Sequence, residues 1–273
     1  MSLSKTMPQV LAGKRAIITG AAGGMGLEHA RHLARLGADI AIFDIDLEVA
    51  KKWNDKLNGQ TVVDDICALG VDCIAIQVDV TNTAATQAAV DQVVAQWPDI
   101  DILVNNAGGA VAPFERSSPT SITDEDTHRV VNLNLMSTVN CCRAVAPYLR
   151  CPGASIINIA TINAEMEVSG GKQALYGASK AAVIRYTRSL AVELGPKGIR
   201  ANSLSPGYVE TPRIVAQAAA RPGLSGNDLL GKIPLRRSGR SEDVSRVVEF
   251  LAGPLSDYVT GNNIRVSGGM ELV

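Results

Sequence analysis

The sequence predicts a doubly wound α/β fold, in which helices cover both faces of one parallel sheet. Short β-branched runs alternate along the chain with longer segments of helical periodicity, which is the order of elements in such folds. Most of the runs are continuously apolar rather than alternating, as strands buried on both faces are. A glycine-rich turn also follows the first run and opens a helix, at the kind of junction where these folds bind ligands.

Seven runs account for the expected sheet, and right-handed crossovers would join them in parallel. They are predicted to be strands at residues 15–19, 39–43, 73–78, 102–105, 155–159, 200–205 and 263–266. One sheet with its helices can take up all 273 residues, so we expect a single domain over 1–273. Residues 1–12 precede the first strand as an N-terminal extension.

Two stretches, 109–121 and 208–233, are loop-rich and contain scattered Pro and Gly. Both follow predicted strands at the carboxyl edge of the sheet, where open α/β sheets bind their ligands. We expect these stretches to wall a substrate site, with 208–233 as a substrate loop.

The composition argues against several classes of function. Lys and Arg total 26 and Asp and Glu total 27, without a long run of either sign, so nucleic acid and membrane partners are not expected. The apolar stretches are too short for a bilayer span and no signal peptide is recognisable, which favours a cytoplasmic protein. The five cysteines and three histidines lack the spacing of a metal site, so no metal is expected.

The glycine-rich turn at 19–26 is the first candidate binding site. Its glycines allow a tight turn and a close approach of the backbone to a pyrophosphate, while the helix that follows offers unpaired N–H groups. The spacing differs from GxGxxG, but the strand–turn–helix context still predicts a dinucleotide site. The expected contacts are Gly20, Ala22, Gly23, Gly24, Met25 and Gly26.

Asp44, at the end of the second predicted strand, is where a carboxylate would accept a hydrogen bond from a ribose 2′-hydroxyl. The same charge would repel a 2′-phosphate, and no Arg or Lys stands in the glycine-rich turn or immediately after Asp44, so NAD is favoured over NADP. Asp46 is the alternative ribose ligand, although its position also suits a helix cap.

Tyr176 and Lys180 lie four residues apart in a helical segment at 176–195, and therefore on one face. An ammonium beside a phenol favours the phenolate, which would lower the pKa of Tyr176 toward that of a general base. Such a pair is common by chance, so its weight depends on the other motifs.

Together the motifs resemble the short-chain dehydrogenase/reductase family over essentially the whole chain. The matching pieces are TGAAGGMG at 19–26, Asp79-Val80, NNAG at 105–108, YGASK at 176–180, PGYVET at 206–211 and SGGM at 267–270. The resemblance implies a Rossmann-like seven-stranded sheet and hydride transfer between a nicotinamide cofactor and an alcohol or carbonyl substrate. It also implies a homotetramer or homodimer, built through the helices around 123–148 and 176–195 and the C-terminal tail.

The resemblance assigns further roles by position. Tyr176 would be the acid/base, Lys180 would also hold a ribose, and Asn134 would hold a water that relays protons, with Asn132 as the alternative. The additional cofactor contacts that it implies are Asp79, Val80, Asn106, Ala107, Gly108, Pro206, Gly207, Val209 and Thr211.

The chain departs from the family at the catalytic Ser. Asn163 stands thirteen residues before Tyr176, where the Ser is expected, whereas counting from the preceding strand selects Thr161. We favour Thr161, because its hydroxyl can donate to a substrate oxygen as a Ser does. Asn163 and, more remotely, Ser169 remain alternatives.

The substrate is less well defined. Asn163, Glu165, Tyr208 and Arg213 are the candidate substrate contacts. A second possible activity is reduction of 3-oxoacyl thioesters on a carrier protein, for which Arg236, Arg237 and Arg240 could form a basic docking surface. A third possibility, from a different class, is an NAD-binding sensor that has lost catalysis.

Overall fold

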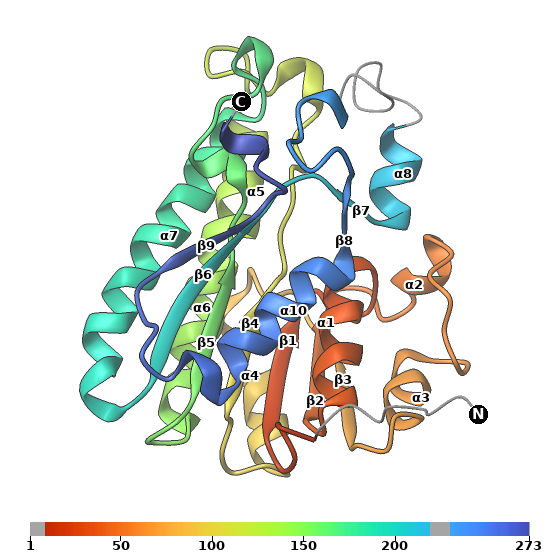
Figure 1. The fold of residues 1–273 in the computed structure, drawn as a ribbon, viewed down its shortest axis with the longest axis vertical. Helices are drawn as coiled ribbons and strands as arrows, with labels where there is room; N and C mark the ends of the chain where they lie inside the picture. The colour runs from red at the N-terminus through yellow and green to blue at the C-terminus, as the bar shows by residue number, and fades with distance from the viewer. Residues whose placement is uncertain (1–8, 219–229, 273) are drawn as a thin grey trace.

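The computed structural model describes residues 9–218 and 230–272, in which seven parallel strands form one sheet in the order β3-β2-β1-β4-β5-β6-β9 (Figure 1). The chain starts at β1, moves outward to β3, and then returns to place β4 on the other side of β1. This reversal creates the switch point at which doubly wound sheets bind ligands. The strands are β1 (Arg15–Thr19), β2 (Asp39–Asp44), β3 (Cys73–Gln77), β4 (Ile102–Asn105), β5 (Ser155–Ile159), β6 (Arg200–Pro206) and β9 (Asn263–Val266).

The predicted fold class is confirmed, and the predicted strands differ from the observed ones only at their ends. β2 continues through Asp44, β3 ends at Gln77, and β6 continues to Pro206. The sequence did not predict a separate pair of two-residue parallel strands, β7 (Val209–Glu210) and β8 (Gly239–Arg240).

Helices cover both faces of the sheet, and each face has its own apolar core (Figure 1). One core includes side chains of α1 (Gly24–Arg35), α3 (Val62–Cys67) and α10 (Ser241–Ala252). The other includes side chains of α4 (Thr83–Val94), α6 (Ser137–Val145) and α7 (Ala174–Leu194). The remaining α-helices with described bounds are α2 (Val49–Lys52), α5 (Asp124–Val131) and α8 (Pro212–Ala218).

A chain of buried amides crosses the middle of the sheet. Asn105 and Asn158 lie opposite each other on β4 and β5, and Asn105 Nδ2 donates to Asn158 Oδ1 over 2.8 Å. Asn158 Nδ2 in turn donates to Thr187 Oγ1 of α7 over 2.8 Å. The strand ends that face the site are therefore joined to the helix that carries Tyr176.

The two stretches expected to be loops differ from each other. The first, 109–121, contains a 3₁₀ turn at Phe114–Arg116 and is otherwise made of turns, bends and irregular backbone. The second, 208–233, carries β7 and α8 in its described part, and residues 219–229 lie outside the described residues. The N-terminal extension also ends earlier than expected, because Leu11 is buried and its N–H donates to Leu36 O. Residues 1–8 of that extension lie outside the described residues.

Candidate active site

The glycine-rich turn has a backbone that only glycine allows at its tightest point. Gly20 and Gly24 have φ values of 62° and 57°, in the left-handed region. A Cβ atom on Gly26 would lie 2.1 Å from Gly20 O and 2.5 Å from Asn106 Nδ2. The turn is therefore packed directly against the end of β4, with the start of α1 above it.

Asn106 fixes this packing across the switch point. Its Nδ2 donates to Thr19 O over 3.0 Å and to Gly20 O over 2.9 Å. The backbone N–H groups of Asn106 and Ala107 both donate to Thr19 Oγ1, each over 3.0 Å. The segment after β4 is thereby held against the glycine-rich turn after β1.

Asp44 lies beside the turn, as expected. Its Oδ2 accepts from Ala22 N over 2.9 Å, and its Oδ1 accepts from Asp46 N over 3.2 Å. Burial raises the pKa of this carboxyl, and the backbone N–H groups around it oppose that effect. Asp46 instead accepts from Glu48 N over 2.9 Å in the turn before α2, but Glu48 is the N-cap of that helix, so Asp46 does not cap it.

Asp79 lies just beyond β3 and binds its own loop. Its Oδ1 accepts from Thr81 N over 2.9 Å and from Thr81 Oγ1 over 2.7 Å. The next residue, Val80, is buried in the core under α4. This arrangement leaves Asp79 exposed near the carboxyl end of the sheet.

A second carboxylate at the turn was missed by the sequence analysis. Asp55 Oδ2 accepts from Gly24 N, the first residue of α1, over 2.9 Å. The helix has Gly23 at its N-cap, which has no side chain to accept this hydrogen bond. In the sequence, a glycine at the N-cap position indicates that another residue must accept this hydrogen bond, but it does not indicate that the acceptor is Asp55.

At the catalytic end, Tyr176 lies in the first turn of α7 and Lys180 one turn further on. Lys180 is 2% exposed, its Nζ donates to Ile159 O over 2.7 Å, and burial lowers its pKa to about 8. Burial raises the pKa of Tyr176, whereas a hydrogen bond with the Thr161 side chain and the charge of Arg213 lower it. The expected lowering of this pKa by Lys180 is therefore not found, because burial has the largest effect and leaves the pKa of Tyr176 raised.

Thr161 is the candidate that lies against Tyr176. It directly follows β5, is 8% exposed, and hydrogen-bonds the phenol. Asn163 Nδ2 instead donates to Gln173 Oε1 over 2.9 Å. Ser169 is exposed in a 3₁₀ turn.

Asn134 is buried against the segment that follows β4, where it contacts Gly109, while Asn132 is exposed. It lies in a π-turn (Asn132–Met136) between α5 and α6, a local widening that often marks functional sites. Its Oδ1 accepts from Gly109 N over 2.9 Å, and its Nδ2 donates to Gly109 O over 3.0 Å.

Gly108 separates Asn134 from Lys180. A Cβ atom there would lie 2.9 Å from Asn134 Oδ1 and 3.0 Å from Lys180 Nζ. These two polar groups thus converge on one backbone position beside Tyr176.

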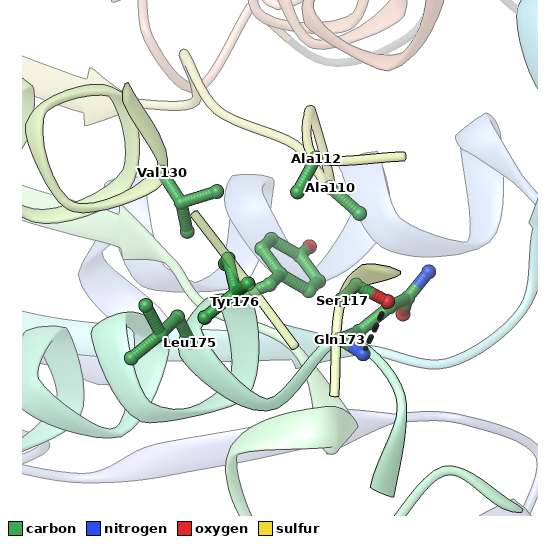
Figure 2. Close-up of a pocket in the computed structure, with 8 residues that line it drawn as sticks. Ala110, Ala112, Ser117, Val130, Gln173, Leu175 and Tyr176 are labelled. Atoms are coloured by element: carbon green, nitrogen blue, oxygen red, sulfur yellow. Dashed lines mark hydrogen bonds between the residues drawn. The ribbon is translucent and has the colours of Figure 1, made fainter. Parts of the chain in front are cut away.

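A small recess opens beside the ring of Tyr176 (Figure 2). Its polar members, Ser117 and Gln173, bind each other, since Gln173 N donates to Ser117 Oγ over 3.0 Å. The recess therefore offers an apolar environment next to an acid/base group. The other lining residues are Ala110, Ala112, Ile122, Val130 and Leu175.

Comparisons with known proteins decide the family. A family model described as "Enoyl-(Acyl carrier protein) reductase" matches residues 20–271. A short-chain type dehydrogenase/reductase of Mycobacterium marinum has a similar structure, with a TM-score of 0.82 and 31% identity over 96% of this chain and 97% of its own. The chain belongs to the short-chain dehydrogenase/reductase family.

Curated relatives of this dehydrogenase/reductase act on alcohols or carbonyls by name. Cyclohexanol dehydrogenase of Rhodococcus sp. (strain TK6) is 39% identical over 264 residues, which cover 95% of this chain and 97% of the relative. A 3-oxoacyl-[acyl-carrier-protein] reductase of Chlamydia pneumoniae is 34% identical, covering 97% and 99%. Trans-4-hydroxycyclohexanecarboxylate dehydrogenase of Sinomonas cyclohexanicum is 34% identical, covering 95% and 93%. The protein is an oxidoreductase that acts on CH–OH groups.

The family binds nicotinamide cofactors, and the residues of this chain fit one. The turn is packed against the protein at Gly20 and Gly26, whereas a Cβ atom on Gly24, at the start of α1, would meet no atom within 4 Å, so a pyrophosphate has room there. A dehydrogenase of Burkholderia cenocepacia J2315, solved in complex with NADP, has a TM-score of 0.80 and 33% identity over 96% of this chain and 99% of its own. A nicotinamide cofactor is thus consistent with the fold of this dehydrogenase/reductase.

The expected residues after β6 lie where β7 and α8 begin. Gly207 is in close contact with the C-terminal tail, because a Cβ atom there would lie 2.8 Å from Ser267 Cα. Thr211 Oγ1 accepts from Ile214 N over 3.2 Å, in the first turn of α8. Pro206 ends β6 and Val209 begins β7, so all four residues belong to one turn at the carboxyl edge of the sheet.

The proposed substrate contacts of this dehydrogenase/reductase do not all reach the recess. Glu165 forms an ion pair with Arg265 over 2.5 Å, which lowers the pKa of its carboxyl and turns it toward β9. Asn163 contacts Gln173 at the edge of the recess, and Tyr208 O accepts from Gly239 N over 3.0 Å. Arg213 lies against Gly109, next to the recess.

Within residues 9–218 and 230–272, no cluster of His, Cys, Asp or Glu is arranged to hold a metal ion, and all five cysteines are free. In the same described part of the chain, no helix combines the length and the apolar character needed to cross a membrane.

Proposed function

We propose that this enzyme transfers a hydride between NAD(H) and a secondary alcohol or the corresponding ketone, with Tyr176 as the general acid/base. The carrying observation is the position of Tyr176, whose ring borders an apolar recess while its hydroxyl contacts Thr161. A phenol in that position can exchange a proton with a substrate oxygen in the recess.

The neighbouring side chains orient the substrate, relay the proton and help to hold the cofactor. Thr161 donates a hydrogen bond to the substrate oxygen, while Tyr176 takes the hydroxyl proton during oxidation and returns it during reduction. Lys180 and Asn134, on either side of Gly108, carry that proton onward, and Lys180 helps to hold the cofactor ribose. When bound, the nicotinamide accepts or supplies the hydride.

The preference for NAD is supported by two carboxylates at the glycine-rich turn. Asp44 binds Ala22 N and Asp55 binds Gly24 N, so both negative charges lie along the same short loop. A 2′-phosphate placed beside Asp44 would be repelled by both, whereas a hydroxyl would find an acceptor.

An apolar alicyclic substrate suits this site. The recess is lined mainly by Ala, Ile, Val and Leu side chains, and two relatives are named for reactions on substituted or unsubstituted cyclohexanols. Cyclohexanol and cyclohexanone are therefore the first substrates to assay.

Replacement of Tyr176 by Phe tests the acid/base. Because the phenol hydroxyl is lost, we expect kcat for cyclohexanol to fall by about 10²–10⁴-fold. Binding of NADH, followed by fluorescence, should persist, since the ring remains. A variant that keeps most of its kcat would contradict the role of Tyr176, and a wild-type enzyme that binds NADH but turns over no alcohol or ketone would favour the sensor.

Replacement of Asp44 by Ala tests the cofactor. We expect the wild-type enzyme to have a higher kcat/KM with NAD⁺ than with NADP⁺, and the variant to lose about tenfold or more of that ratio. Asp55→Asn should lower the ratio in the same direction. An unchanged ratio in both variants would mean that neither carboxylate discriminates.

Reduction of 3-oxoacyl thioesters is the second candidate, favoured by the relative from Chlamydia pneumoniae. The proposed basic surface is partly neutralised, however, because Arg237 pairs with Asp243 over 2.6 Å. The guanidinium group of Arg236 is also engaged within the chain, since it donates to Gly231 O. Turnover of acetoacetyl-thioester with NADPH at a higher kcat/KM than that of cyclohexanone would select this function instead.

We also propose that the chain works as a homotetramer or homodimer, assembled through α5, α6, α7 and the C-terminal tail. The long helix α7 carries Val192, which is 79% exposed in the single chain and is suited to such an interface.

A further inference from the structure

Arg213 is placed at the edge of the active site without a function in the proposed chemistry. It lies in the first turn of α8, and its Nη2 and Nη1 are 3.5 Å and 4.0 Å from the position that a Cβ atom on Gly109 would occupy. The next residue, Ala110, lines the recess beside Tyr176. The guanidinium group therefore lies beside the backbone of Gly109, next to Ala110 in the wall of the recess.

No carboxylate among the described residues forms an ion pair with Arg213. Two acidic side chains of the same region bind elsewhere, Glu165 to Arg265, and Glu210 to Ser238 Oγ over 2.8 Å. The positive charge nevertheless acts on the site, since it lowers the pKa of Tyr176. Arg213 is thus a cation without a carboxylate partner among the described residues, and it is close enough to the acid/base to influence it.

The recess has the complementary property of carrying no charge of its own. Its eight lining residues include neither an acidic nor a basic side chain. A substrate anion would consequently meet one cation at the edge of the recess and no repelling carboxylate within its walls. The planar fork of a guanidinium binds a carboxylate through two parallel hydrogen bonds.

We infer that Arg213 binds a carboxylate group of the substrate, so that the preferred substrates are hydroxy acids with the hydroxyl on an apolar ring or chain. This inference rests on the proposed function, because it uses the same recess and the same acid/base. The apolar body of the substrate would lie between Ala110 and Leu175, with its hydroxyl at Tyr176 and its carboxylate at Arg213.

The test compares trans-4-hydroxycyclohexanecarboxylate with its methyl ester, which has the same ring and hydroxyl but no charge. In the wild-type enzyme we expect kcat/KM for the acid to exceed that for the ester by about tenfold to a hundredfold, mainly through KM. In Arg213→Gln the ratio should fall toward one, and Arg213→Lys should retain part of it, because the charge remains without the fork. Arg185→Gln, an exposed arginine on α7, is the matched control and should keep the wild-type ratio.

Two results would overturn the inference. The first is an equal kcat/KM for acid and ester in the wild-type enzyme. The second is a raised KM for NAD⁺ in Arg213→Gln with an unchanged ratio of acid to ester, which would assign Arg213 to the cofactor phosphates.

A binding measurement separates this inference from the proposed function. Cyclohexanecarboxylate has the ring and the charge but no hydroxyl, so its binding to the enzyme with NADH, measured by calorimetry, requires no turnover. Binding that is lost in Arg213→Gln supports the carboxylate subsite even if no alcohol is oxidised. The same affinity in both proteins would contradict the subsite even if cyclohexanol is a good substrate.

Discussion

Thr161 is the residue on which the proposed chemistry of the chain depends most. It follows β5 at the position where the family has a Ser, and its hydroxyl contacts the phenol of Tyr176. Its extra methyl group restricts χ1, so the hydroxyl is held in fewer orientations than that of a Ser. A fixed donor suits a site that binds one substrate geometry.

Removal of that hydroxyl gives a prediction at the residue scale. Thr161→Val keeps the branched shape but loses the donor, so we expect kcat to fall by about a hundredfold, while Thr161→Ser stays within a few-fold of the wild-type enzyme. Steady-state kinetics with one alcohol measure both. If Asn163→Ala lost kcat to that degree and Thr161→Val did not, the donor role would pass to Asn163.

The site was predictable from the sequence where its residues are close together in the chain. Tyr176 and Lys180 share one helix face, and Gly20 to Gly26 form one turn, so local spacing was enough to locate them. Asp55 reaches Gly24 from 31 residues away and Arg265 reaches Glu165 from 100 residues away. Such contacts depend on how the loops fold back, which neither periodicity nor motif spacing specifies.

At the scale of elements, the central strands were predicted well because they are buried on both faces. β5, for example, is buried at all five positions, and three of its five residues are Ile. β7 and β8 have two residues each, too few to show any period. Helix α8 was missed because it lies in a segment with scattered Pro and Gly.

The packing of α1 against α10 contains a histidine that resists protonation. His29 is fully buried, and its Nδ1 lies 2.7 Å from Ser245 Oγ. Burial, and then the nearby His32, lowers the pKa of His29 to about 3. The neighbouring His32 lies 2.6 Å from Glu249 Oε2, so Glu249 contacts His32 and not His29.

His29 predicts an acid-sensitive stability. Below its unfolded pKa of 6.5 the unfolded chain takes up a proton that the folded chain does not, so the free energy of unfolding falls as the pH drops from 6.5 toward 3. Between pH 7 and pH 5 this amounts to about 2 kcal/mol. Urea unfolding should show that His29→Gln loses this part of the pH dependence, whereas His128→Gln, at an exposed position, does not. An identical pH dependence in His29→Gln and the wild-type protein would contradict the explanation.

At the scale of the whole molecule, the proposed assembly is the main expectation still to be measured. Native mass spectrometry should give the mass of two or four chains. Val192→Asp, which places a charge on the exposed face of α7, should shift the protein toward smaller species. A monomeric wild-type protein at micromolar concentration would contradict the proposed assembly.

The amide chain through Asn105 and Asn158 also has a consequence for how the sheet assembles. Parallel strands with uniformly apolar faces offer few cues against sliding, because an Ile at one position packs much like a Val at the next. A slip of β5 along β4 would break the hydrogen bond between Asn105 Nδ2 and Asn158 Oδ1, at a cost of about 1–3 kcal/mol for a buried group left unpaired. The hydrogen bond between Asn105 and Asn158 therefore favours the native register of β4 and β5 over shifted registers during folding.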